Sequence, residues 1–172
     1  MLKLSAAVWD RRNGLTFVLY GCSGGIYEEK FEITDLEIRD ARQISEDQYE
    51  YYSDEYRPLK KDDMYFTPDG TAFIRGHVQI PAHMKGKNIY FTLHTAAEMI
   101  VKINGKYVGG VDPNRERILI NPYIDSDDLT IEIEAYNRSK PDDERNPASL
   151  AHRGCRQIFE GAYLATIRDN VQ

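Results

Sequence analysis

The sequence has little cysteine, no long apolar run and no excess of basic residues, and each shortage excludes a class of protein. Its two cysteines, Cys22 and Cys155, are too few and too far apart for a disulfide scaffold, so we expect free thiols in a reducing compartment. No apolar segment approaches the roughly 20 residues that a membrane-spanning helix requires. The apolar N-terminus is too short for a signal peptide and runs directly into Asp10, Arg11 and Arg12. We therefore expect a cytoplasmic protein with no membrane partner.

The charge and length of the chain narrow the possibilities further. A formal net charge of −6 argues against a nucleic-acid partner, because phosphate binding needs a basic surface. A chain of 172 residues, of which 41% are hydrophobic, is long enough for one domain with a full core and too short for two. We expect residues 1–172 to form a single domain.

Helical periodicity is nearly absent, and apolar and polar residues instead alternate with a period of two. Within 72–80, Ile74, Val78 and Ile80 share one face, and Pro81 then ends the strand because it has no N–H for a ladder. The same pattern predicts a series of further strands. They are 15–20, 36–39, 89–94, 99–103, 106–109, 117–120, 129–136 and 162–167.

Turn signals separate these strands. Asn104-Gly105 predicts a hairpin, because a type I′ turn needs positive φ at both central residues. The tyrosine-rich segment 47–56 is expected to be a surface loop whose rings lie on the sandwich, and 137–155 a second long irregular segment. Short strands with frequent turns are typical of an all-β fold, here an antiparallel β-sandwich of the jelly-roll kind.

The motifs of metal sites and catalytic centres are missing. The four histidines do not have the spacing of zinc ligands, so we expect no metal site in this domain. Glu132 and Glu134 share a strand face that we expect to be solvated, not catalytic. Ser23 lies between Gly21 and Gly25 at the spacing of a nucleophile elbow, but no helix is predicted to follow. The four histidines are His77, His83, His94 and His152.

Two groups of residues leave alternatives open. Asp125, Asp127 and Asp128 have the chemistry of a calcium site, although a solvated acidic turn before a strand is favoured. The cluster 49–52 is either a sugar platform or an edge segment folded over the sheet, and the second is favoured.

Aromatic and planar polar residues in the predicted loops make carbohydrate binding a candidate function. Rings can cover the C–H surface of a sugar, and amide, carboxylate and guanidinium groups can form paired hydrogen bonds with its hydroxyls. The same residue types serve equally well in an interface between domains, and we favour that interpretation. The candidates are Tyr107, Asp112, Asn114, Arg115, Tyr136, Asn137 and Arg138.

Three stretches in order resemble a known family. Asp-Gly-Thr-Ala-Phe-Ile-Arg at 69–75, Ala-Glu-Met-Ile-Val-Lys-Ile-Asn-Gly-Lys at 97–106 and Gly-Val-Asp-Pro-Asn-Arg at 110–115 are similar to the N-terminal domain of bacterial family 38 α-mannosidases. Tyr-Arg-Pro-Leu at 56–59 matches a segment upstream, and the resemblance extends over about 49–136. It implies a galactose-binding-like β-sandwich in a bacterial, cytoplasmic enzyme.

The resemblance also implies a role without catalysis. The parent enzymes use a divalent metal and an aspartate nucleophile, but no His-Ile-Asp motif occurs here and a barrel of roughly 250 residues does not fit. We therefore expect an accessory module that needs no cofactor, whose partner is the catalytic domain of the same polypeptide, with a mannose-containing glycan as a second partner. The alternatives are an independent carbohydrate-binding module and the sugar-binding domain of a family 2 β-glycosidase, which shares part of the pattern.

Overall fold

The computed structural model describes residues 26–63, 70–93, 97–112, 115–136 and 159–168. Their secondary structure is almost entirely antiparallel strand, with two short 3-10 turns, Ala82–Met84 and Asn121–Tyr123. Among the described residues, no helix has the length and apolar character needed to cross a lipid bilayer. The strands are β1 (Tyr27–Ile33), β2 (Asp35–Ser45), β3 (Gln48–Tyr51), β4 (Arg57–Pro58), β5 (Thr71–Gln79), β6 (Ile89–Leu93), β7 (Glu98–Ile103), β8 (Lys106–Val111), β9 (Arg117–Leu119), β10 (Asp128–Tyr136) and β11 (Ala162–Ile167).

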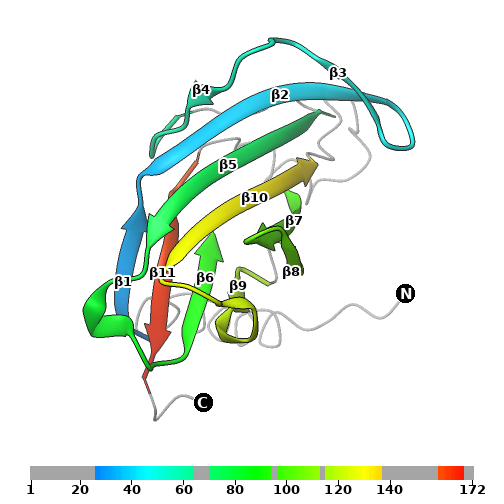
Figure 1. Ribbon diagram of the computed structural model, residues 1–172. Helices are drawn as coiled ribbons and strands as arrows, with labels where there is room; N and C mark the ends of the chain where they lie inside the picture. Colours follow the sequence, from blue (N-terminus) through cyan, green and yellow to red (C-terminus); the bar gives the residue numbers. More distant parts are fainter. Residues whose placement is uncertain (1–25, 64–69, 94–96, 113–114, 137–158, 169–172) are drawn as a thin grey trace, which may run out of the picture.

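The strands form two sheets with a jelly-roll order. The small sheet has the order β1-β11-β6-β9, and the large sheet has the order β3-β2-β5-β10-β7-β8, with β4 paired to β2 (Figure 1). From β5 onward the chain passes repeatedly from one sheet to the other, which places β10 between β5 and β7. Without β2, β3 and β4, two four-stranded sheets remain, as in an eight-stranded jelly roll. The predicted all-β antiparallel sandwich is confirmed.

The core fills the space between the two sheets with aliphatic and aromatic side chains. On β5 and β10 the buried residues alternate with exposed ones, and Ile74 and Ile133 face each other across the ladder. The small sheet contributes Phe91 and Leu164, both fully buried. Burial of each such side chain contributes roughly 1.5–3 kcal/mol relative to leaving it in water. The period-two pattern of the sequence is therefore the pattern of the core.

The hairpin from β7 to β8 contains the predicted turn and an additional bulge. Asn104 and Gly105 have φ values of 50° and 73°, as a type I′ turn requires. Val101 pairs with Gly109 while the neighbouring Lys102 pairs with Tyr107, so Val108 is an extra residue on β8. This β-bulge uses the positive φ of Gly109, 146°. As a result Val108 stays buried while Tyr107 is exposed.

The region before β5 differs from the prediction. The segment 47–56 is not a loop throughout, because Gln48–Tyr51 forms β3 and pairs with β2. The strand predicted at 36–39 extends from Asp35 to Ser45, and β1 was not predicted because polar residues occupy most of its positions. The predictions for 15–20 and 137–155, and those that involve Cys22, Cys155 and Ser23, fall outside the described residues.

Candidate functional site

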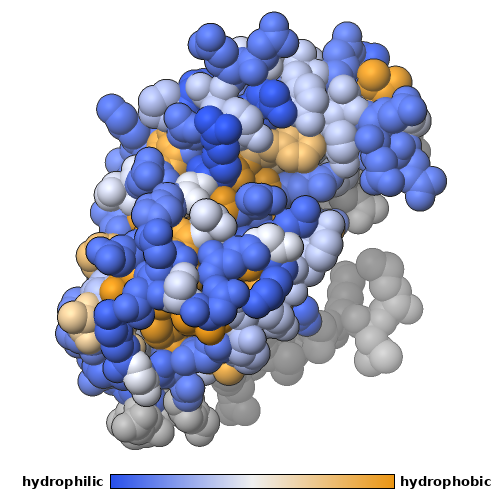
Figure 2. Space-filling model, in the orientation of Figure 1, coloured by the Kyte–Doolittle hydropathy of each residue, from blue (hydrophilic) through white to orange (hydrophobic). Residues whose placement is uncertain are grey.

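The candidate site is the face of the large sheet that points away from the core. Residues on alternate positions of its strands point there, so side chains distant in sequence become neighbours. Figure 2 shows polar residues over most of the visible surface, with apolar patches between them. We call the face of the large sheet that points away from the core the outer face. It carries Glu37 and Arg39 of β2, Tyr49 and Tyr51 of β3, Phe73 and Arg75 of β5, Ile100 and Lys102 of β7, Tyr107 of β8, and Glu132 and Glu134 of β10.

An aromatic cluster covers the β3 side of the outer face. The ring of Phe73 lies 4.9 Å from that of Tyr49, edge to face, and 5.5 Å from that of Tyr51. Such aromatic pairs add about 0.5–1.5 kcal/mol beyond their buried area. The guanidinium of Arg39 lies over Tyr51, 3.6 Å from the ring centroid. The rings of 49–51 thus lie on the sheet, as expected for an edge segment folded over it, even though the backbone is a strand.

Tyr56 joins this cluster to the centre of the sheet. Its ring is approached by two guanidinium groups, from Arg75 at 4.0 Å and from Arg39 at 4.8 Å from the ring centroid. Arg75 also bonds Glu37, with Nε donating to Oε2 at 2.8 Å. Because the planar guanidinium makes both contacts, its position is defined by a ring and a carboxylate together.

Acidic and basic side chains alternate across the rest of the outer face. Lys102 Nζ lies 4.0 Å from Glu132 Oε2, and His77 Nε2 lies 2.6 Å from Asp128 Oδ1. Side chains this exposed gain little from ion pairing, about 0–1 kcal/mol each. These pairs therefore order the surface more than they stabilise the fold.

Tyr49 and Glu134 form a short hydrogen bond on the outer face, and this bond changes the pKa of Tyr49. The Tyr49 hydroxyl donates to Glu134 Oε1 at 2.5 Å. The carboxylate, together with burial and nearby negative charge, raises the pKa of Tyr49 to about 12. Tyr49 therefore stays a neutral donor at physiological pH, and Glu134 is engaged as an acceptor.

Two adjoining hollows lie over β10 and β5 on the outer face. The first, about 290 Å³, is bordered by Tyr56, Phe73 and Tyr107, and the second, about 320 Å³, extends toward β2. Arg75 and Glu132 line both hollows, which therefore adjoin each other. We call the two hollows together the groove. A third hollow of about 490 Å³, also bordered by Asp35 and His77, lies toward β1.

Of the candidate residues predicted from the sequence that the structure describes, Tyr107 lies apart from the other three. Tyr107 is 67% exposed and borders the groove, with Lys102 Nζ 4.6 Å from its ring centroid. Asp112 and Arg115 pair with each other beyond the other end of β8, where the Asp112 carboxylate also accepts from the Arg115 backbone N–H at 3.1 Å. Four residues lie between Tyr107 and Asp112, which places the two about 16 Å apart along the chain. Tyr136 is the last residue of β10. Asn114, Asn137 and Arg138 lie outside the described residues.

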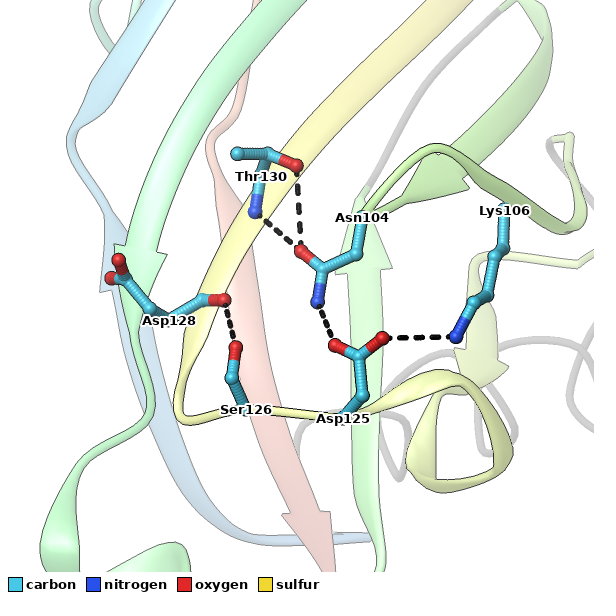
Figure 3. A network of polar contacts seen from close by, with 6 residues as sticks. All are labelled: Asn104, Lys106, Asp125, Ser126, Asp128 and Thr130. Atoms are coloured by element: carbon cyan, nitrogen blue, oxygen red, sulfur yellow. Dashed lines mark hydrogen bonds and ion pairs between the residues drawn. The ribbon is translucent and has the colours of Figure 1, made fainter.

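A polar network near the hairpin occupies the region of the calcium alternative (Figure 3). Asn104 Oδ1 accepts from the Thr130 backbone N–H at 2.9 Å, and its Nδ2 donates to Asp125 at 2.8 Å. Lys106 donates to the same carboxylate at 2.9 Å, and these hydrogen bonds and the lysine charge lower the pKa of Asp125. The network joins the hairpin to the start of β10.

The three acidic residues of this turn have different side-chain partners. Asp125 bonds Lys106, Asp127 bonds Lys85, and Asp128 bonds His77. Each carboxylate is thereby engaged by a side chain from a different segment. In the part of the chain that the structure describes, no three His, Cys, Asp or Glu side chains are grouped as metal ligands.

Sequence reasoning missed several groove residues. Arg75 and His77 are exposed, as their alternation with Ile74 and Val78 implies, but the partners Glu37, Arg39 and Tyr56 come from distant segments. The alternation on β5 and β10 was the available signal for the residues that point outward. It does not reveal which side chains from other segments contact those residues.

Comparisons with known proteins give a distant structural likeness. No protein-family model matches the sequence, and no curated protein matches it. A solved structure of the β-D-glucuronidase from Dictyoglomus thermophilum is 18% identical, with a TM-score of 0.46, over 83% of this chain and 29% of that chain. The chain spans under a third of the glucuronidase, and a likeness this distant carries no functional argument.

Proposed function

We propose that this chain is a non-catalytic accessory domain of a glycoside hydrolase, which packs against the catalytic domain of the same polypeptide and shapes its active-site mouth. The observation that supports this most directly is where the family-like stretches lie. The described parts of 69–75, 97–106 and 110–115 fall on β5, β7 and β8 of one sheet. Separate sequence motifs therefore belong to one structural unit.

The arrangement of carboxylates supports a role without catalysis. A retaining glycosidase needs two carboxyl groups that face each other across the sugar. Glu132 and Glu134 instead stand side by side on β10, one beside Lys102 and the other holding the Tyr49 hydroxyl. Neither has the setting of a general acid or a nucleophile.

One end of the large sheet offers a surface for the catalytic domain. The Asp112–Arg115 turn and Tyr136 lie at this end, where β8 and β10 finish and β7 begins. Tyrosine and arginine are enriched in the anchors of protein interfaces. We therefore assign Asp112, Arg115 and Tyr136 to the proposed interface with the catalytic domain.

The parent enzyme is proposed as a family 38 α-mannosidase, with a family 2 β-glycosidase as the alternative. Both patterns include a strand with arginine, an aliphatic strand and an Asn-Gly hairpin followed by glycine, here Arg75, β7, Asn104-Gly105 and Gly109. These elements support the two parents equally, and an independent carbohydrate-binding module remains the third candidate.

The experiment is an activity assay on the complete gene product that contains this chain. Hydrolysis of an aryl α-mannoside supports the mannosidase, hydrolysis of an aryl β-glycoside supports the family 2 enzyme, and no hydrolysis of either overturns the accessory role. As a control, the 172-residue chain alone should hydrolyse neither substrate. Turnover by the chain alone would overturn the non-catalytic assignment.

A further inference from the structure

We propose that the groove on the outer face binds a neutral oligosaccharide. This inference deepens the proposed function by giving the domain a ligand of its own. It is measured by binding to the chain, not by hydrolysis, so its failure is distinguishable from failure of the accessory role.

The shape of the groove suits a chain-like ligand. Its two hollows share Arg75 and Glu132 and together extend from Tyr107 on β8 to His77 on β5. The path crosses β7, β10 and β5, where the strands are paired on both sides of β10. A ligand lying there spans several strands and contacts side chains from each.

The charges of the groove select against an anionic ligand. Asp35, Glu37, Glu132 and Glu134 line it, against two fixed cations, Arg75 and Lys102. An excess of carboxylates repels phosphate and uronate groups. Carboxylates accept hydrogen bonds only, whereas arginine and lysine donate only. A hydroxyl-bearing sugar does both, so it can pair with every one of these groups.

Aromatic rings at one end of the groove supply the apolar contact that a pyranose needs. Tyr107 is 67% exposed, and Ile100, which lines the same hollow, is 51% exposed. Phe73 and Tyr56 line the same hollow. Arg75 is held by the Glu37 carboxylate and the ring of Tyr56 before any ligand arrives, which lowers the entropy cost of binding.

A peptide fits this groove less well than a sugar. Extended peptides gain affinity by adding a strand to an open sheet edge. The groove lies over β10 and β5, which are interior strands whose backbone groups are already paired with both neighbours. A peptide lying here would leave its own N–H and C=O groups without a ladder.

The test is calorimetric titration of the complete chain with the neutral tetrasaccharides of mannose, glucose and xylose, and with the cationic tetramer of glucosamine. We expect at least one neutral tetrasaccharide to bind with a Kd below about 1 mM. Tyr107→Ala should weaken that binding about fivefold or more, because the exposed ring is lost. Tyr107→Phe should retain it, since the ring remains.

The matched control is Tyr52→Ala. Tyr52 is also exposed, at 55%, but does not line the groove. Its removal should leave the affinity unchanged. The proposal is overturned if no neutral tetrasaccharide binds, if only the glucosamine tetramer binds, or if the two alanine variants weaken binding equally.

Discussion

The jelly-roll strands from β5 onward and the added strands β2 to β4 belong to the same structure but are held by different interactions. Strands β5 and β10 pair over nine residues and present alternate side chains to a common core. Strand β3 has four residues, of which none is fully buried, and its tyrosines contact Phe73 on the outer face. The first region depends on burial between sheets, whereas the second depends on rings and hydrogen bonds spread over the surface of one sheet.

This difference explains why the groove lies where it does. The added strands bring Glu37, Arg39 and Tyr56 beside side chains of β5 that would otherwise face solvent. An eight-stranded jelly roll alone would present a flatter row of charges. The added strands β2 to β4, which we call the extension, thus convert part of a solvated surface into a lined hollow.

The largest expected effect is at the junction of the two regions. Gly76 of β5 lies against β2, and a Cβ there would be 2.3 Å from Leu36 Cδ2 and 2.6 Å from the Asp35 carbonyl oxygen. Because a backbone atom cannot move aside cheaply, Gly76→Ala should lower the free energy of unfolding by about 3 kcal/mol, as urea denaturation can measure. Gly110→Ala, whose nearest contact is 3.4 Å, is the control. Equal losses in the two variants would contradict the close approach.

The next largest effect is a loss of stability that should affect the extension more than the jelly-roll strands. Phe73→Ala removes the ring between Tyr49 and Tyr51 without touching the core, and should cost about 2 kcal/mol. Hydrogen exchange should accelerate mainly in β3 and β4, while β10 keeps its protection. Exchange that accelerates uniformly in both regions would show that the extension is no separate unit.

A smaller loss of stability is expected in the jelly-roll region, when the polar network around Asn104 is removed. Asn104→Gly keeps the positive φ of the turn but removes the hydrogen bonds to Thr130 and Asp125. The expected loss is about 1 kcal/mol, in line with exposed side-chain hydrogen bonds. Thermal unfolding would measure it. A variant as stable as the parent would mean that Asn104 serves the turn alone.

The smallest expected effect is a pH dependence of the free energy of unfolding, which arises from Tyr49 in the extension. The pKa of Tyr49 rises from 10.0 to about 12 on folding, so its contribution is complete below pH 10 and is lost as pH rises toward 12. Denaturant unfolding at pH 9 to 12 should therefore show a steeper fall for the parent protein than for Tyr49→Phe, which cannot ionise there. Parallel curves would contradict the hydrogen bond to Glu134.

The sequence predicted the jelly-roll half closely because its signals are local. Alternation marked the inner faces of β5, β6 and β10, and Asn104-Gly105 marked the hairpin. Strand β1 of the jelly roll and strand β3 of the extension were harder, since both expose most of their residues and therefore lack a clear period-two pattern. The bulge at Val108 was also invisible, because it is defined by the register between two strands.

By itself, the sequence determined the all-β class, the inward residues of the main strands and the turn at Asn104-Gly105. The physical reason is that each depends on neighbours within a few positions, through the two-residue period of a strand or the φ preference of a residue. Only the tertiary structure decided the groove. Glu37, Arg75, Glu132 and Tyr107 come from separate strands that the sheet register makes neighbours, and Tyr56 meets Arg75 from the segment between β3 and β4.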